Sequence, residues 1–258
     1  MNMVLPADKF ILFAQHGCSA CLRTKEFLSG KKINFVTIDI MNDPGGREKL
    51  HELGLRHVPT VYRDGKSVTV LGSSLDDVAR FVGLNRADHQ SLPPGKLVEK
   101  YITVLTAAQR YIRQLPDERL PELIIENRNS SIRLQCHHIF NIADRFVETA
   151  GGGVKLEPTS VPSDKAFNTS EELVRYGENV ITRLRKWWNE LADKSCQKNV
   201  QTYFGTQTVH MLLERCTWHS AQHTRQLMVI NERLGIEPNG RLTADDLAGL
   251  PLPDGLWE

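Results

Sequence analysis

The stretch Phe10-Ile-Leu-Phe-Ala-Gln-His-Gly-Cys-Ser-Ala-Cys21 decides the fold of the N-terminal part of the chain. It opens with five apolar residues, Phe10–Ala14, which predict a buried strand, and it closes with two cysteines separated by two residues. A helix is expected over residues 20–29. Cys18 therefore lies where a helix begins, and there unpaired backbone N–H groups and the positive end of the helix dipole stabilise a thiolate.

Strand and helix signals alternate over residues 1–84. A strand with several β-branched residues is expected at residues 33–38, and a helix after the Asp43-Pro-Gly-Gly turn. Two strands then flank the turn Asp64-Gly65, and a last helix begins near Ser74. This order predicts an α/β domain in which a βαβ unit is followed by a hairpin and a helix.

A polar segment at residues 85–95 ends in Pro-Pro-Gly and is expected to be a linker, because strand signals nearly vanish after it. Apolar residues then recur at three- and four-residue spacing, which predicts an all-α four-helix bundle at residues 96–235. The expected helices are 96–114, 128–149, 169–192 and 205–234. Residues 236–258 are expected to form an irregular tail.

Composition excludes several classes of protein. The 258 residues include 32 Lys and Arg against 31 Asp and Glu, and this balance argues against a nucleic-acid partner. No apolar run reaches the roughly 18 residues that a membrane span needs, and we expect the N-terminal apolar stretch to be a strand rather than a secretion signal. Five scattered cysteines do not suit a disulfide scaffold, so a reducing, cytoplasmic setting is expected.

The two N-terminal cysteines have the spacing of a thiol–disulfide exchange site. The thiolate is the attacking species in such exchange, which predicts Cys18 as the nucleophile. Cys21 lies one helical turn further on and is placed to resolve a mixed disulfide. The alternative is half of a zinc site, but a structural zinc needs four ligands and the chain has no second pair of this spacing.

The last expected helix carries two histidines, His219 and His223, on the stripe that should face the bundle interior. Four residues turn about 40° around a helix, so both rings lie on one face and can share a metal ion. Histidines satisfied in the core or at the surface are the alternative. A further ligand must come from another helix, where His137 and His138 are adjacent, and helical phase does not choose between them.

The N-terminal domain resembles the glutaredoxin and thioredoxin superfamily. Besides the cysteine pair, His57-Val-Pro-Thr60 matches the Val-Pro dipeptide before the third strand, and Gly72-Ser-Ser-Leu-Asp-Asp77 is similar to the segment that holds the γ-glutamyl carboxylate of glutathione. The resemblance implies a cis proline facing the cysteines and a bound low-molecular-weight thiol, with glutathione as a candidate. The implied thiol-binding residues are Val58, Pro59, Gly72, Ser73, Ser74, Asp76 and Asp77.

The segments Cys136–Asp144 and Glu214–Leu227 resemble the DinB/YfiT-like superfamily of metal-binding four-helix bundles. The resemblance implies His138, His219 and His223 as ligands of a divalent metal, zinc first, with nickel or iron as alternatives. Three protein nitrogens leave coordination positions open for water, substrate or a thiolate. Cys216 lies on the same stripe and is either a fourth ligand or a buried core residue.

Members of that superfamily include thiol-dependent S-transferases and isomerases. We therefore expect a metal-dependent enzyme that uses a small thiol and a small electrophilic or disulfide substrate, coupled to the thiol–disulfide exchange domain. Two other functions stay open: a redox or metal sensor or carrier without turnover, and a glutathione-linked disulfide oxidoreductase whose bundle docks a partner. Related bundles often dimerise, so a homodimer through the bundle is also expected.

Overall fold

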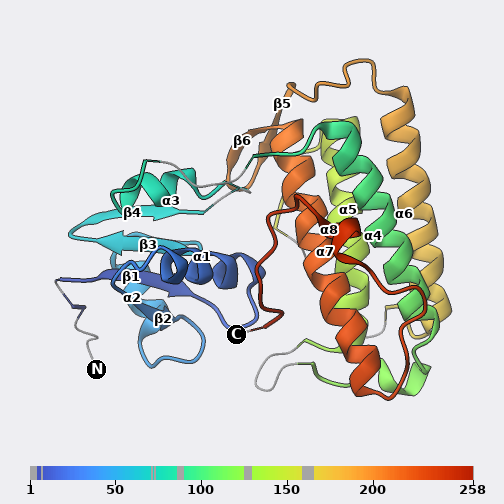
Figure 1. Ribbon diagram of the computed structural model, residues 1–258, viewed down its shortest axis with the longest axis horizontal. Helices are drawn as coiled ribbons and strands as arrows, with labels where there is room; N and C mark the ends of the chain where they lie inside the picture. Colours follow the sequence, from blue (N-terminus) through green and yellow to red (C-terminus); the bar gives the residue numbers. More distant parts are fainter. Residues whose placement is uncertain are drawn as a thin grey trace. The chain divides into compact units, whose positions relative to one another are not determined.

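The computed structural model describes residues 5–6, 8–70, 72, 74–85, 90–124, 130–158 and 166–257 (Figure 1). The chain forms two compact units, Met1–His89 together with Pro253–Glu258, and Gln90–Leu252. The first is an α/β thioredoxin-fold unit and the second is an all-α four-helix bundle, so the predicted fold class is confirmed. The first unit thus takes in residues 253–258, which the sequence assigned to a separate tail at residues 236–258.

The first unit contains a four-stranded sheet. Its elements, in chain order, are β1 (Phe10–Ala14), α1 (Ser19–Gly30), β2 (Phe35–Asp39), α2 (Gly46–Glu52), β3 (Thr60–Arg63), β4 (Lys66–Thr69) and α3 (Asp76–Phe81). The strand order is β2-β1-β3-β4, in which β1 pairs with β2 in parallel and with β3 antiparallel. Since a parallel connection needs a crossover, α1 links β1 to β2, whereas β3 and β4 form a hairpin.

Strand β1 is buried on both faces, which explains its uninterrupted apolar sequence. Leu12 and Ala14 pack into one apolar cluster with residues of α1 and α3. Ile11 and Phe13 point to the other face and pack into a second cluster with Leu50 of α2. The cysteine pair follows directly from the end of this central strand.

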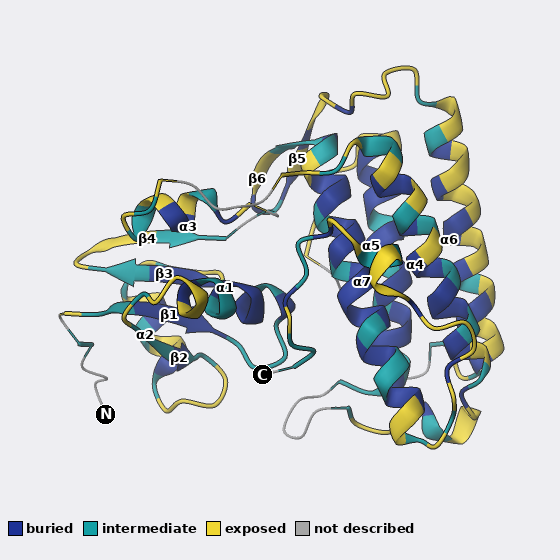
Figure 2. Cartoon of the chain, viewed as in Figure 1, coloured by how far each residue is buried: buried dark blue, intermediate teal, exposed yellow. Residues whose placement is uncertain are grey.

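The second unit is built from four long helices: α4 (Pro94–Arg113), α5 (Ile132–Gly152), α6 (Ser170–Glu190) and α7 (Val209–Arg233). Helices α4 and α5 each pack mainly against α6 and α7, so the two helices that are consecutive in sequence lie across the bundle from one another. Figure 2 shows their buried inner faces and exposed outer faces. Among the described helices, none has the length and apolar character to cross a bilayer.

A short hairpin precedes the last long helix, and the sequence did not predict it. Strands β5 (Asn199–Thr202) and β6 (Gly205–Thr208) pair antiparallel, so the helix expected from residue 205 begins at Val209 instead. The Thr208 side chain caps this helix by accepting the backbone N–H of Met211 at 3.2 Å. A 3₁₀ turn, η1 (Asp117–Arg119), and a short helix, α8 (Ala244–Leu247), complete the unit.

The last described residues pack on the thioredoxin-fold unit. The carboxylate of Glu26, on α1, accepts the backbone N–H groups of Asp254 and Gly255 at 2.7 and 2.8 Å. Pro253 is buried. This end of the expected irregular tail is therefore held by charge-assisted hydrogen bonds to α1.

Gly177 of α6 allows α5 and α6 to pack closely, because it has no side chain to meet Phe140. A Cβ at this position would lie 2.5 Å from Cζ of Phe140, which is fully buried on α5. We expect Gly177→Ala to lower the free energy of unfolding by about 1–3 kcal/mol, as overpacking does. Gly152→Ala is the matched control, because its Cβ would meet nothing nearer than 3.9 Å. Equal urea midpoints for the two variants would contradict this packing.

Candidate functional site

The first candidate site is the cysteine pair at the start of α1. Cys18 is the N-cap residue, and its Sγ accepts the backbone N–H of Cys21 at 3.2 Å. A disulfide joins the two cysteines, whose Cα atoms are 5.2 Å apart. Cys18 is half-buried, whereas Cys21 is 0% exposed. After reduction, Cys18 is therefore the sulfur that a disulfide substrate can reach, and Cys21 lies behind it.

Val58 and Pro59 lie just before β3, and the peptide bond between them is cis, as the resemblance implies. Val58 packs against the same apolar cluster as Cys18. The carbonyl oxygen of Pro59 accepts the backbone N–H of Val70 at 3.0 Å. The dipeptide thus borders the cluster around the cysteines, and its contact with a thiol stays a prediction.

The acidic segment before and within α3 is the other part of the predicted thiol site. Ser74 Oγ accepts the backbone N–H of Asp76 at 2.9 Å, and Asp77 forms an ion pair with Arg80. Gly72 is half-buried, while Ser73 lies outside the described residues. Since the Asp77 carboxylate already has a cation partner, binding of glutathione by this segment stays a prediction.

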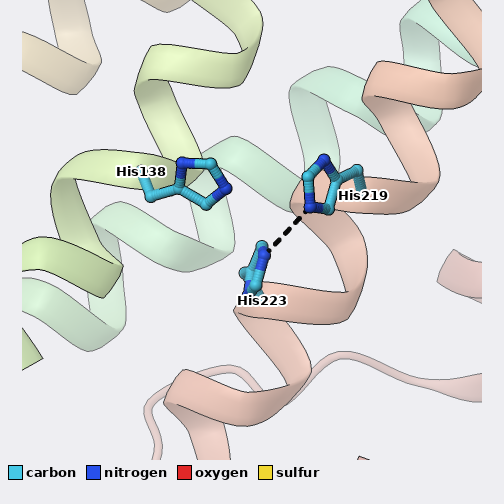
Figure 3. Close-up of side chains that lie close together, drawn as sticks. All are labelled: His138, His219 and His223. Atoms are coloured by element: carbon cyan, nitrogen blue, oxygen red, sulfur yellow. Dashed lines mark hydrogen bonds between the residues drawn. The ribbon is translucent and has the colours of Figure 1, made fainter. Parts of the chain in front are cut away.

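The second candidate site lies inside the bundle, where α5 and α7 meet. Figure 3 shows the rings of His138, from α5, and of His219 and His223, from successive turns of α7, facing one another. One nitrogen from each ring can be chosen so that all three lie within 4.8 Å of one another. The Nε2 atoms of His219 and His223 are 3.1 Å apart. Among the described residues, no other histidine, cysteine or carboxylate joins this group.

These three rings suit a divalent metal. Two nitrogens bound to one tetrahedral zinc at about 2.0–2.1 Å would lie about 3.3–3.4 Å apart, close to the separation of the His219 and His223 Nε2 atoms. The third ring, that of His138, approaches from the neighbouring helix α5, and its centroid lies 5.3 and 4.9 Å from those of the other two rings. Neutral imidazoles suit zinc, nickel and iron. The donor set thus fits a metal that keeps an open position.

The electrostatics of the cluster favour the neutral form of His219. Burial, together with the neighbouring His223 and His138, lowers the pKa of His219 well below its ordinary value. The charge of Arg215, one turn earlier on α7, acts in the same direction. Arg215 stacks over Phe204 and donates to the Tyr203 hydroxyl, and in the described part of the chain it has no carboxylate partner. A positive charge here favours an anionic ligand at the cluster.

The packing of α5 against α6 resolves the choice between the two adjacent histidines. His137 stacks on Tyr176 with an interplanar angle of 11° and also contacts Phe167. Desolvation by burial lowers its pKa. His138 instead points to α7. The sequence alone could not distinguish the roles of His137 and His138, because the partner rings of His138 come from α7, which is far away in the sequence.

The bundle cysteines are not part of the histidine cluster. Cys216 is buried on α7, and burial raises the pKa of its thiol to about 11. Burial also raises the pKa of Cys136, on α5. Among the described residues, the cluster of metal-ligand type contains no sulfur, so Cys216 has the position of a buried core residue rather than of a fourth ligand.

Two glutamines that the sequence did not single out as site residues contact the cluster. Gln226 Oε1 lies 2.7 Å from His223 Nδ1, and Gln135 Nε2 donates to the same oxygen at 2.7 Å. Their positions give a signal in hindsight: each is three residues from a histidine of the cluster, one on α5 and one on α7. A polar residue at such a spacing on a buried face needs a partner.

Comparison with known proteins identifies the class of the first unit. A family model described as Glutaredoxin matches residues 10–68, an interval that contains the cysteine pair and the cis proline. The first unit is therefore a glutaredoxin-like domain, joined in this chain to a four-helix bundle. No curated protein matches the chain significantly.

Among solved structures, a YfiT protein from Bacillus subtilis, described as a probable metal-dependent hydrolase with an unusual four-helix bundle topology, is 14% identical. The match covers 58% of this chain and 94% of that protein, with a TM-score of 0.47. A mutant form of a mycothiol-dependent maleylpyruvate isomerase is also 14% identical, with 61% and 68% covered and a TM-score of 0.41.

The unequal burial of the cysteine pair predicts unequal reactivity. In the reduced protein we expect iodoacetamide to modify Cys18 first, because this thiol is reachable and lies at a helix N-terminus. Cys18→Ser should abolish the fast phase, whereas Cys21→Ser should keep it. Cys196→Ser, which removes another buried thiol, is the control. Loss of the fast phase in Cys21→Ser alone, followed by mass spectrometry, would reverse the assignment.

Proposed function

We propose that the protein is a metal-dependent enzyme that uses a low-molecular-weight thiol. In this proposal His138, His219 and His223 hold a divalent metal, and Cys18 with Cys21 exchanges the thiol through a disulfide. The transferase or isomerase class is the expected reaction type. Zinc is the first candidate metal, with nickel and iron as alternatives, and glutathione is a candidate thiol.

The observation that carries the proposal is the composition of the histidine cluster. Three imidazoles converge from two helices, and among the described residues no fourth protein donor joins them. A structural zinc site is closed by four protein ligands, whereas a site that performs chemistry keeps a position open. The cluster is therefore suited to a ligand that enters and leaves.

When bound, a divalent metal supplies a positive charge that lowers the pKa of a thiol next to it. The chain contributes neutral histidines, which leave that charge uncompensated. Arg215 adds a second positive charge near His219 and is available to an anionic group of the thiol or of the electrophile. The buried thiols of Cys136 and Cys216 have raised pKa values, so these two cysteines of the bundle do not compete with the external thiol as thiolates.

The cysteine pair supplies the thiol by exchange. The Cys18 thiolate attacks one sulfur of a mixed disulfide, which forms a bond to that sulfur and releases the other sulfur as a thiolate. The Cys21 thiolate then attacks Cys18, forms the Cys18–Cys21 disulfide and releases the second thiolate. One disulfide is reduced, and the cysteine pair is oxidised. Two equivalents of external thiol are needed to reduce the pair again.

We expect the metal to depend on all three histidines of the cluster. His138→Ala, His219→Ala and His223→Ala should each weaken zinc binding by more than about 100-fold, the upper end of what losing a mere supporting hydrogen bond costs. His137→Phe is the matched control, because it keeps a ring against Tyr176 and Phe167. Chelator competition measures the affinity. Normal zinc binding in all three alanine variants would overturn the proposal.

Coupling of the two sites is tested in a single turnover of reduced, zinc-loaded, full-length protein. A glutathione mixed disulfide and chlorodinitrobenzene are the substrates, and absorbance follows the glutathione conjugate. We expect the conjugate to be lost on chelation and also in Cys18→Ser. Free glutathione should restore the reaction in Cys18→Ser but not in the chelated protein.

Other outcomes of this experiment identify the other functions. Release of glutathione with no metal-dependent conjugation, even when free glutathione is added, would favour a plain disulfide oxidoreductase. Zinc binding that changes with the redox state of the cysteine pair, without conjugate, would favour a sensor or carrier. Full activity both on chelation and in Cys18→Ser would reject the coupled scheme.

A further inference from the structure

A chain of hydrogen bonds leads from Gln135 on α5, through Gln226, to Nδ1 of His223. Gln135, on α5, is 7% exposed, and its Nε2 lies 2.7 Å from Oε1 of Gln226 and 3.4 Å from the backbone oxygen of His223. Gln226 is 3% exposed, and the same Oε1 lies 2.7 Å from Nδ1 of His223. All three side chains are buried, so these partners replace water.

The orientation of the two amides follows from what each atom can donate. A backbone carbonyl oxygen only accepts, so the end of the Gln135 amide that faces the His223 carbonyl must be the NH₂ group. This group also faces Gln226, which therefore presents its oxygen. An amide oxygen has two lone pairs and can accept from Gln135 and from a ring N–H together. The Nδ1 atom of His223 consequently carries a proton.

A neutral imidazole has one N–H and one lone pair. With the proton on Nδ1, the lone pair of His223 is on Nε2, the atom that lies 3.1 Å from Nε2 of His219. Ligand nitrogens must present a lone pair, and the hydrogen bond at the other nitrogen decides which one does so. The glutamine pair thus determines that Nε2 of His223, rather than Nδ1, presents its lone pair to the cluster.

We propose that Gln226 is a positioning residue, oriented by Gln135, that keeps the Nε2 lone pair of His223 directed into the histidine cluster before a metal binds. This inference rests on the proposed metal site. A glutamine also differs from the carboxylate that often supports a ligand histidine, because it orients the ring without adding negative charge. The metal would therefore keep more of its charge for an anionic ligand.

The first test uses metal-free, full-length protein. Long-range proton–nitrogen correlation spectra of ¹⁵N-histidine-labelled protein report which ring nitrogen carries the proton. We expect His223 to be protonated at Nδ1 in the wild type, and this preference to be lost in Gln226→Met. Gln226→Glu keeps an acceptor oxygen and should keep the preference. A wild-type His223 protonated at Nε2 would overturn the inference.

The second test measures zinc affinity of the same variants by chelator competition. Gln226→Met should weaken binding about 10–100-fold, and Gln226→Glu should restore it. Gln109→Met is the matched control, since it also removes a buried glutamine, one that donates to the Val174 carbonyl, and should leave both measurements unchanged. Unchanged affinity and tautomer in Gln226→Met would overturn the inference.

The two proposals fail in different ways. Wild-type protein that binds zinc and has the expected tautomer, yet conjugates no thiol, would reject the enzyme while supporting the role of Gln226. Equal loss of zinc binding in Gln109→Met and Gln226→Met, with the His223 tautomer unchanged in both, would show a general packing effect and reject that role.

Discussion

The contact between α5 and α7 is the constraint on which the rest of the bundle depends. It brings three imidazoles into an interior where polar groups are costly unless they are partnered. The order of packing makes this contact possible, because α5 lies beside α6 and α7 rather than mainly beside the preceding helix α4. The bundle therefore uses part of its core for polar partners instead of filling that space with apolar side chains.

The chemistry of the cluster is consistent with a thiol as its ligand. Burial lowers the pKa of His219, Arg215 places a positive charge near that ring, and burial raises the pKa values of the Cys136 and Cys216 thiols. A cation held this way attracts anions more strongly than one held by carboxylates. The glutaredoxin-like domain would carry the complementary chemistry of the proposed function, because an N-cap cysteine with a buried second cysteine is suited to thiol–disulfide exchange.

The sequence predicted the features that local spacing determines. The continuous apolar run at Phe10–Ala14, the three-residue spacing of the cysteine pair and the four-residue spacing of the two histidines of α7 are all visible within short stretches of the sequence. The sequence did not predict the hairpin β5–β6, because its strands are mostly polar. The hairpin is also supported by backbone hydrogen bonds of Gln201 and Tyr203 to Leu156, which is far away in the sequence. Its presence also shifted the start of α7 to Val209.

The rest of the candidate site depends on tertiary packing. His137 packs against aromatic side chains on and before α6, which leaves His138 to face α7. The periodicity of α5 alone cannot predict this packing, because the aromatic partners are far away in the sequence. Gln135 and Gln226 are ordinary polar residues in sequence and acquire a role only because α5 and α7 bring their amides together. Local patterns thus predicted two of the three histidines of the cluster, His219 and His223, but neither the choice of His138 over His137 nor the contacts that orient the rings.

X-ray absorption at the zinc edge of the reduced, zinc-loaded, full-length protein is the most direct measurement of the central claim. Three imidazole nitrogens at about 2.0–2.1 Å and no sulfur are predicted before a thiol is added, and one sulfur at about 2.3 Å after glutathione is added. Fewer than three imidazoles, or a protein sulfur bound before any thiol is present, would contradict an open three-histidine centre.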